Sequence, residues 1–318
     1  MVNINTLQID KSILKKKYVI MERKKHYLPD GTFYITHSCN LTCHNCESYN
    51  NKKFKGHYTW EKYKSYYQEW GKIINLGGII NIHGGEPLTN PDIMNWADGL
   101  MSIWPDAEEY TVSSNGTLLS NKKELVLELA NKGWRWDISV HDPITFNPII
   151  DNLLEIFKEY NFRLVDGYED EKKIIDCKTG KTIATILPQY YFLKNSTRYI
   201  KKGVIYMWRN DIEAAHRLCQ NKSRWPGDTE GDTPCRFFVG GRLFKCHLTA
   251  ITEDLIKQFT IEEEAVELLK QYKPASPFEP RESVDNFIEN LHKPLDQCTL
   301  CPVSEKRFPL YPLSKKKQ

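Results

Sequence analysis

The stretch "HSCNLTCHNCESY" spans residues 37–49 and places Cys39, Cys43 and Cys46 on one short segment. Three residues separate the first two cysteines, and two residues separate the last two. A structural zinc site uses four ligands, usually as two separated pairs, and a disulfide uses two cysteines. Three thiols on a single loop therefore suit a metal centre that keeps one coordination position open.

The composition is that of an ordinary globular protein, with 40% hydrophobic and 27% charged residues. A chain of 318 residues can form one large α/β domain, with or without a smaller extension. The net charge of +3 is too small to indicate nucleic-acid binding by itself. No apolar run approaches the roughly 20 residues that span a bilayer. We therefore expect neither nucleic acid nor a membrane as a partner.

The chain has nine cysteines, and its first residues lack the apolar stretch and cleavage site of a signal peptide. We therefore expect a cytoplasmic protein with reduced thiols, in which metal binding or catalysis explains the cysteines better than disulfides do. Cys177 stands apart from the others in a strand–turn–strand pattern, which is typical of a packed or edge thiol.

Strand-like and helix-like stretches alternate from residue 32 to about residue 166. Residues 59–74 predict a helix capped by Thr59, with an aromatic stripe on one face. Asn90 and Pro91 predict the start of the next helix. The alternation indicates βαβ units and a parallel sheet. The units are too few for a closed eight-stranded barrel, so we expect an α/β fold with a partial (β/α)6 TIM-like barrel.

Four polar motifs each follow a predicted strand of this barrel: the cysteine loop, "GGEP" at 84–87, "SSNG" at 113–116 and "SVHD" at 139–142. The active sites of such sheets gather at the C-terminal ends of the strands. We therefore expect these motifs to meet at one mouth of the barrel.

The cysteine spacing after a first strand, together with "GGEP" after the second, resembles the radical S-adenosylmethionine (radical SAM) superfamily over about residues 32–166. The resemblance implies that Cys39, Cys43 and Cys46 hold three irons of a [4Fe–4S] cluster. The fourth iron would bind S-adenosylmethionine, and one electron would cleave it to a 5′-deoxyadenosyl radical that abstracts hydrogen from a substrate carbon. The cofactor carries this chemistry, and the protein binds and orients it.

The resemblance also implies contacts to S-adenosylmethionine. Glu86 can pair with its ammonium group, although backbone contacts from the two preceding glycines are equally plausible. Ser114 and Asn115 can bond the ribose hydroxyls or be simple loop residues, and His141 can contact substrate or be structural. Asn45 stands where the family usually has an aromatic residue, so adenine stacking is not predicted there. The candidate cofactor-binding residues are Gly84, Gly85, Glu86, Pro87, Ser114, Asn115 and His141.

The C-terminal cysteines resemble the auxiliary-cluster extension called Twitch, a shorter relative of SPASM. This resemblance implies a second [4Fe–4S] cluster. Cys219 is an alternative first ligand if residues 220–234, which are typical of a loop, are an insertion. A four-cysteine zinc site is the other interpretation. The favoured ligands are Cys235, Cys246, Cys298 and Cys301.

We thus expect an N-terminal extension (1–31), a radical SAM partial barrel (32–208) and a cysteine-rich Twitch-like region (209–318). The expected function is oxidation of a small polar substrate, with the auxiliary cluster as electron acceptor and flavodoxin or ferredoxin as electron donor. Peptide modification and epimerisation or isomerisation of a small molecule stay open within the same superfamily. A non-catalytic zinc or iron–sulfur binding module is the alternative outside it.

Overall fold

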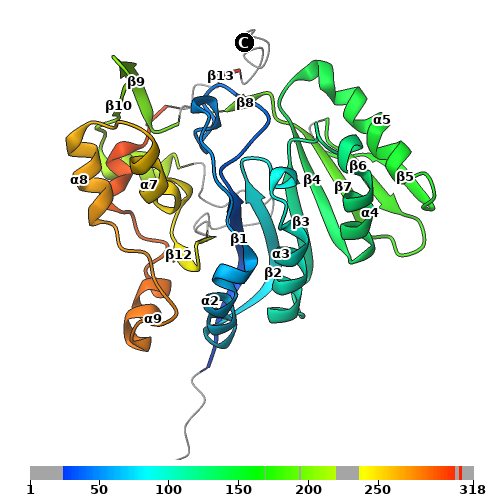
Figure 1. The fold of residues 1–318 in the computed structure, drawn as a ribbon, viewed down its shortest axis with the longest axis horizontal. Coiled ribbons are helices and arrows are strands. Elements are labelled where there is room, and N and C mark those ends of the chain that lie inside the picture. The colour runs from blue at the N-terminus through cyan, green and yellow to red at the C-terminus, as the bar shows by residue number, and fades with distance from the viewer. Residues whose placement is uncertain (1–23, 169, 193–194, 220–235, 305–307, 310–318) are drawn as a thin grey trace, which may run out of the picture.

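The computed structural model describes residues 24–168, 170–192, 195–219, 236–304 and 308–309. These residues form a mixed α/β fold built on one large sheet, with helices against it and a helical C-terminal part beside its edge (Figure 1). Cys235 and the whole of the 220–234 loop lie outside the described residues, as does most of the expected N-terminal extension.

The large sheet has the strand order β12-β11-β1-β2-β3-β4-β7-β6-β5. Six consecutive strands in this order, from β11 to β7, are parallel to their neighbours, and the strands outside them are antiparallel. This arrangement confirms the predicted α/β class and agrees with a partial TIM-like barrel. The strands are β1 (His26–Thr36), β2 (Ile74–Gly84), β3 (Glu109–Ser114), β4 (Trp134–Val140), β5 (Phe162–Asp166), β6 (Lys172–Asp176), β7 (Thr182–Pro188), β11 (Phe237–Val239) and β12 (Arg242–Phe244).

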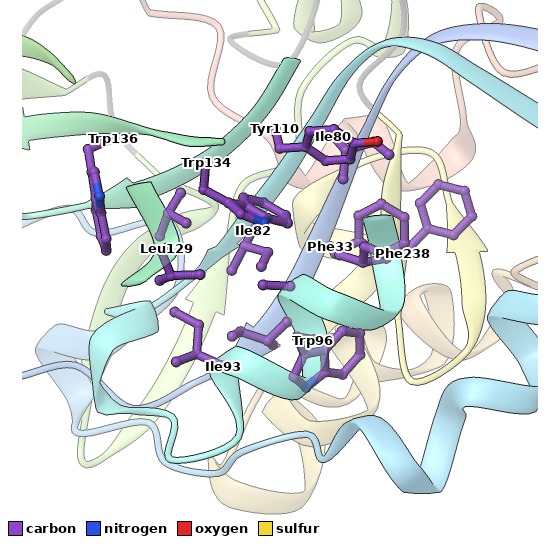
Figure 2. Close-up of a cluster of buried hydrophobic side chains, with 14 of the residues drawn as sticks. Phe33, Ile80, Ile82, Ile93, Trp96, Tyr110, Leu129, Trp134, Trp136 and Phe238 are labelled. Atoms are coloured by element: carbon purple, nitrogen blue, oxygen red, sulfur yellow. The ribbon is translucent and has the colours of Figure 1, made fainter. Parts of the chain in front are cut away.

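Four helices follow the first parallel strands, and Figure 1 shows α3 and α4 in front of the sheet. Between helices and sheet lies a core rich in aromatic side chains, including fully buried Trp96 and Trp136 (Figure 2). Truncating such a side chain to alanine typically costs about 3–5 kcal/mol of folding free energy, so this layer fixes the sheet that carries the polar motifs. The helices are α2 (Trp60–Ile73), α3 (Ile93–Ile103), α4 (Lys123–Asn131) and α5 (Phe146–Ile156).

The predicted N-cap of α3 at Asn90 is two residues too early, because the N-cap of α3 is Asp92. Asn90 is buried, and its side-chain amide donates to the carbonyls of Ile35 and Tyr58 at 2.8 and 3.1 Å. Its Oδ1 accepts from the backbone N–H of Asp92 at 2.9 Å. Asn90 therefore ties this turn to β1 and to the end of the cysteine loop instead of capping the helix.

The strand after α5 also differs from expectation. β5 does not become the next parallel strand, because it pairs antiparallel with β6 at the sheet edge. β6 then turns back through the predicted hairpin, and its partner β7 takes the place beside β4. The chain thus completes the parallel sheet with a strand that follows a hairpin rather than a helix.

Over β3 and β4 the face of the sheet opposite the core is polar. On β4, core residues alternate with Arg135, Asp137 and Ser139, which are half-buried on the other face. Since side chains on successive strand residues point to opposite faces, the strand registers extend this polar face across the sheet. On this face Tyr34 pairs with His83, and a row of neighbouring side chains across β3, β4, β7 and β6 contains Ser113, Asp137, Thr185 and Lys173.

The C-terminal part joins the large sheet instead of standing apart from it, because β11 pairs with β1. The β11–β12 hairpin turns at Gly240 and Gly241, and both glycines have positive φ, which glycine adopts without strain. A second core lies between β11, β12, α7 and α8. The remaining elements are α6 (Ile212–Arg217), α7 (His247–Gln258), α8 (Glu263–Gln271), α9 (Arg281–Glu289), β8 (Tyr191–Phe192), β9 (Thr197–Lys201), β10 (Val204–Met207), β13 (Phe308–Pro309), and the short 3-10 helices η1 (Asn50–Lys52), η2 (Pro87–Thr89), η3 (Ser120–Lys122), η4 (Pro143–Thr145) and η5 (Asp296–Leu300).

Candidate active site

The cysteine loop begins directly after β1, and its three thiols lie close enough to interact electrostatically. Burial raises the pKa of Cys39 and of Cys43 to about 12 and that of Cys46 to about 11. None of the three is in a disulfide. A buried thiol stays protonated unless a cation stabilises its thiolate. Three neighbouring thiols, one buried and two half-buried, are therefore a donor set suited to a metal centre.

The loop turns tightly around these thiols. The backbone N–H of Cys46 donates to the carbonyl of Cys43 at 3.3 Å, and that of Tyr49 donates to the carbonyl of Cys46 at 3.1 Å. Asn45 and Tyr49 both have the left-handed backbone conformation, with φ of 60° and 58°. Asn tolerates this conformation better than most residues, which gives a local reason for Asn45 where the family usually has an aromatic residue.

The "GGEP" motif runs alongside the start of the cysteine loop. The backbone N–H of Gly85 donates to the carbonyl of Thr36, and that of Glu86 donates to the carbonyl of Ser38, both at 2.8 Å. A Cβ atom at Gly85 would lie 2.4 Å from the carbonyl oxygen of Ser38. The glycine is therefore required by this close backbone approach, and the two amides hold the loop rather than a ligand. Pro87 is buried at the start of η2.

Glu86 is completely buried, and its carboxylate joins the ends of β2 and β3. It accepts from Ser114 Oγ at 2.9 and 3.0 Å, from the backbone N–H of Asn115 at 2.7 Å and from that of Leu88 at 3.0 Å. Burial raises the pKa of Glu86 to about 7, against these hydrogen bonds, which lower it. No basic side chain in the described ranges is among the groups that shift this pKa.

Ser114 and Asn115 lie where β3 ends, as predicted, and both are buried. The Asn115 amide donates to Asn40 Oδ1 at 3.0 Å and lies 3.7 Å from Cys39 Sγ. The "SSNG" motif thus touches both the "GGEP" carboxylate and the first cysteine. The structure brings these three motifs together at one edge of the sheet, although their contacts are to one another and do not by themselves identify ribose contacts.

His141 follows β4 at the same edge of the sheet. Its Nδ1 lies 3.1 Å from the carbonyl oxygen of Gln189, and burial lowers its pKa. The neutral ring is therefore the favoured form, and its Nδ1–H can donate to this carbonyl. The bond ties the β4 motif to the residue after β7.

Sequence reasoning missed the role of α7, which holds the cysteine loop at several points. His247 Nε2 lies 3.2 Å from Ser48 Oγ. Farther along the helix, Asp254 Oδ2 accepts from Tyr58 at 2.5 Å and lies 3.0 Å from His37 Nε2. These contacts join residues about 200 positions apart, so no local pattern could have indicated them.

The described C-terminal cysteines lie at three elements, and Cys219 follows the first of them, α6. Cys246 is the N-cap of α7, Cys298 lies in η5, and Cys301 follows η5. Burial raises the pKa of Cys301 strongly, and the charges of Cys246 and Cys219 raise it further. Cys219 is therefore close enough to Cys301 to interact with it electrostatically. Cys235, the favoured ligand from the sequence, lies outside the described residues.

Within the described ranges, no group of three or more His, Cys, Asp or Glu side chains has the spacing that would hold a single metal ion. An iron–sulfur cluster places its thiolates farther apart than a single ion does, because they bind different irons. The all-thiol composition of both cysteine groups fits iron–sulfur ligation. No helix of the described part is long and apolar enough to cross a membrane.

Residues 33–188 match the family model of the radical SAM superfamily. This part of the chain is a radical SAM domain. Such a domain indicates an enzyme, and the family uses S-adenosylmethionine and a [4Fe–4S] cluster. No curated protein sequence matches the chain.

Several solved structures of radical SAM enzymes are similar to this chain at low identity. BtrN in complex with AdoMet and 2-DOIA is 20% identical, with a TM-score of 0.34, over 40% of this chain and 52% of that one. Streptococcus suis SuiB bound to S-adenosylmethionine is 19% identical, with a TM-score of 0.33, over 50% of this chain and 38% of that one. The chain thus spans about half of BtrN and less of SuiB. At TM-scores this low the likenesses carry no argument about its substrate.

Proposed function

We propose that this chain is a radical SAM enzyme that oxidises a small polar substrate, with an auxiliary cluster as electron acceptor. The observation that carries the proposal is the meeting of the cysteine loop, Glu86 and Asn115 beside a polar sheet face. When bound, the cofactor and its cluster supply reductive cleavage of S-adenosylmethionine and abstraction of a hydrogen atom from substrate. The residues below would bind and orient the reactants.

Cys39, Cys43 and Cys46 would hold the cluster, and Glu86 would receive the ammonium group of S-adenosylmethionine. Glu86 is a buried carboxylate, and none of the described residues that shift its pKa is basic. A buried charge is costly unless it is paired. The ammonium group of a ligand would supply the positive charge that this carboxylate lacks. The free-energy cost of burying Glu86 unpaired in the ligand-free protein therefore supports a binding role.

The polar sheet face supports a small polar substrate. Arg135 lies between Glu109 and Asp137, at 2.8 and 3.1 Å from their carboxylates, and its side chain is 17% exposed. On β2 and β3, Asn81 Oδ1 accepts from Thr111 and Ser113, both at 3.0 Å. Such a surface offers hydrogen bonds and charges of both signs, which suit hydroxyl and amino groups better than a hydrocarbon.

The electron balance favours an acceptor near this site. Oxidation of an alcohol carbon to a carbonyl removes one hydrogen atom, one proton and one further electron. The hydrogen atom would go to the deoxyadenosyl group that the cofactor supplies, and the proton would go to solvent or a base. We propose that the further electron goes to a cluster held by Cys246, Cys298, Cys301 and either Cys219 or Cys235. The proximity of Cys219 to Cys301 supports Cys219 as the fourth ligand.

The test is the formation of 5′-deoxyadenosine by the anaerobically reconstituted protein with dithionite. Cys43→Ala should abolish it, since one of three cluster thiolates is lost. Cys177→Ala is the matched control, because this exposed thiol lies in a turn away from the cysteine loop, and it should keep full activity. Continued 5′-deoxyadenosine formation by Cys43→Ala would show that the cluster assignment is wrong.

A further inference from the structure

The hairpin of β9 and β10 projects from the C-terminal part at the upper left of Figure 1. Its outer strand and turn carry Arg198, Lys201 and Lys202, which are all exposed. Between residues 195 and 208 the sequence contains no Asp or Glu. Tyr199 and Ile200 are 46% and 43% exposed beside these charges. The hairpin is therefore a basic surface with apolar side chains at its centre.

The base of this hairpin touches both cysteine groups. Asn195 is buried, and its side-chain amide donates to the carbonyl of Cys46 at 3.1 Å. The next residue, Ser196, has its Oγ 3.7 Å from the Sγ of Cys301. On the other strand, Asn210 follows β10 and donates to the carbonyl of Cys301 at 2.8 Å. The path from the exposed hairpin to each group of thiols is therefore short, because it needs only a few covalent bonds and one direct contact.

An indole ring lies between the basic tip and this base. Trp208 Nε1 donates to the carbonyl of Asn195 at 3.0 Å. The guanidinium carbon of Arg198 lies 6.0 Å from the centre of the Trp208 ring. Tyr199 and Tyr206 stack beside them, with ring centres 4.7 Å apart. The hairpin therefore carries two stacked tyrosines, and its Trp208 is hydrogen-bonded to Asn195, whose side chain donates to Cys46.

We propose that the β9–β10 hairpin is the docking surface for an acidic electron-carrier protein of the flavodoxin or ferredoxin type. The inference rests on the proposed function, in which each cleavage of S-adenosylmethionine consumes one electron from outside the chain. The carrier would lose that electron, and a cluster held by Cys39, Cys43 and Cys46 would gain it. Basic side chains around an apolar centre favour an acidic partner, because complementary charge accelerates encounter and the apolar centre supplies contact area.

Arg209 has acidic partners among the described residues, in contrast to the lysines of the hairpin turn. It lies just beyond β10 and forms ion pairs with Glu262 and Glu264 at 3.2 and 3.4 Å. Within the part of the chain that the structure describes, no ion pair is found for the lysines of the turn, Lys201 and Lys202. Their charges are thus available to a partner, whereas the charge of Arg209 is used within the chain.

The test compares two double charge reversals in exposed hairpin turns of the full, anaerobically reconstituted chain. Lys201→Glu with Lys202→Glu alters the proposed surface. Lys178→Glu with Lys181→Glu, in the exposed turn between β6 and β7, is the matched control. Stopped-flow absorbance measures cluster reduction by a reduced, acidic flavodoxin at low salt. Line broadening in NMR spectra measures binding of the oxidised flavodoxin, which requires no turnover.

The Lys201/Lys202 variant should lose about tenfold in the rate constant for reduction by flavodoxin, as expected for weakened electrostatic steering. Its binding of oxidised flavodoxin should weaken similarly, while its 5′-deoxyadenosine formation with dithionite stays unchanged. Equal effects of the two variants, or no effect of either, would overturn the proposal. The proposal would also be overturned if the Lys201/Lys202 variant lost binding to a single-stranded RNA but kept its binding to flavodoxin, because the hairpin would then recognise nucleic acid. Absent cleavage with dithionite in the unaltered protein would refute the proposed function instead, and the binding measurement would still decide the docking surface.

Discussion

Glu86→Gln offers a test in which stability and binding should change in opposite directions. Glu86 is fully buried, and burial raises its pKa to about 7 from an ordinary value near 4.5. The folded chain thus holds this proton more tightly than the unfolded chain does. Its contribution to stability is largest below pH 4.5 and is lost as the pH rises through about 7. At pH 8 the buried charge should cost about 3 kcal/mol, at about 1.4 kcal/mol per pKa unit.

Glutamine removes the charge and keeps one acceptor oxygen. It weakens one of the bonds from Ser114 or Asn115, which offsets about 1–1.5 kcal/mol of the gain. The net expectation at pH 8 is about 1–2 kcal/mol of added stability, or about 2–4 °C in melting temperature. Near pH 5 the folded wild-type side chain is already protonated, so this gain disappears, and the variant should melt slightly below the wild type because of the weakened bond. The same change should weaken S-adenosylmethionine binding at least about tenfold, since an ammonium loses a charged partner.

The assay is thermal melting of the purified proteins between pH 5 and pH 8, with equilibrium dialysis for the cofactor. Glu109→Gln is the control, because that carboxylate is 43% exposed and paired with Arg135, so its loss should not stabilise the protein. If Glu86→Gln leaves the pH dependence of melting unchanged, the buried-charge argument is wrong. If cofactor affinity is unchanged, Glu86 does not receive the ammonium group.

Two further changes test the cysteine loop and the second cysteine group. Gly85→Ala should cost about 1–3 kcal/mol of folding free energy and lower the iron content, because its Cβ would lie 2.4 Å from the backbone oxygen of Ser38. Gly167→Ala is the control and should do neither, because its Cβ would meet only the side chain of Glu171. Equal melting temperatures and iron contents of the two variants would contradict this prediction. Cys298→Ala with Cys301→Ala should keep 5′-deoxyadenosine formation but lose oxidised product; equal losses in a folded variant would favour a structural role for these thiols.

The family and the fold class could be predicted from the sequence because the signals are local. Three cysteines at fixed spacing and a Gly-Gly-Glu-Pro run after a strand are short segments whose chemistry can be read without knowing their neighbours. The helix over α2 was predicted equally well, because its apolar spacing repeats within a few turns. The start of α3 was not, because Asn90 is used by long-range bonds to Ile35 and Tyr58 rather than by its own helix.

What the sequence by itself determined is thus the set of motifs, the alternation of strands and helices, and the chemistry that the thiols suit. Only the tertiary structure decided which side chains meet. It paired Glu86 with Ser114, seated α7 against the cysteine loop through Asp254, and brought Cys219 near Cys301. The physical reason is that these contacts join segments far apart in the chain, whose geometry is fixed by the strand order and the packed core and leaves no local sequence signal.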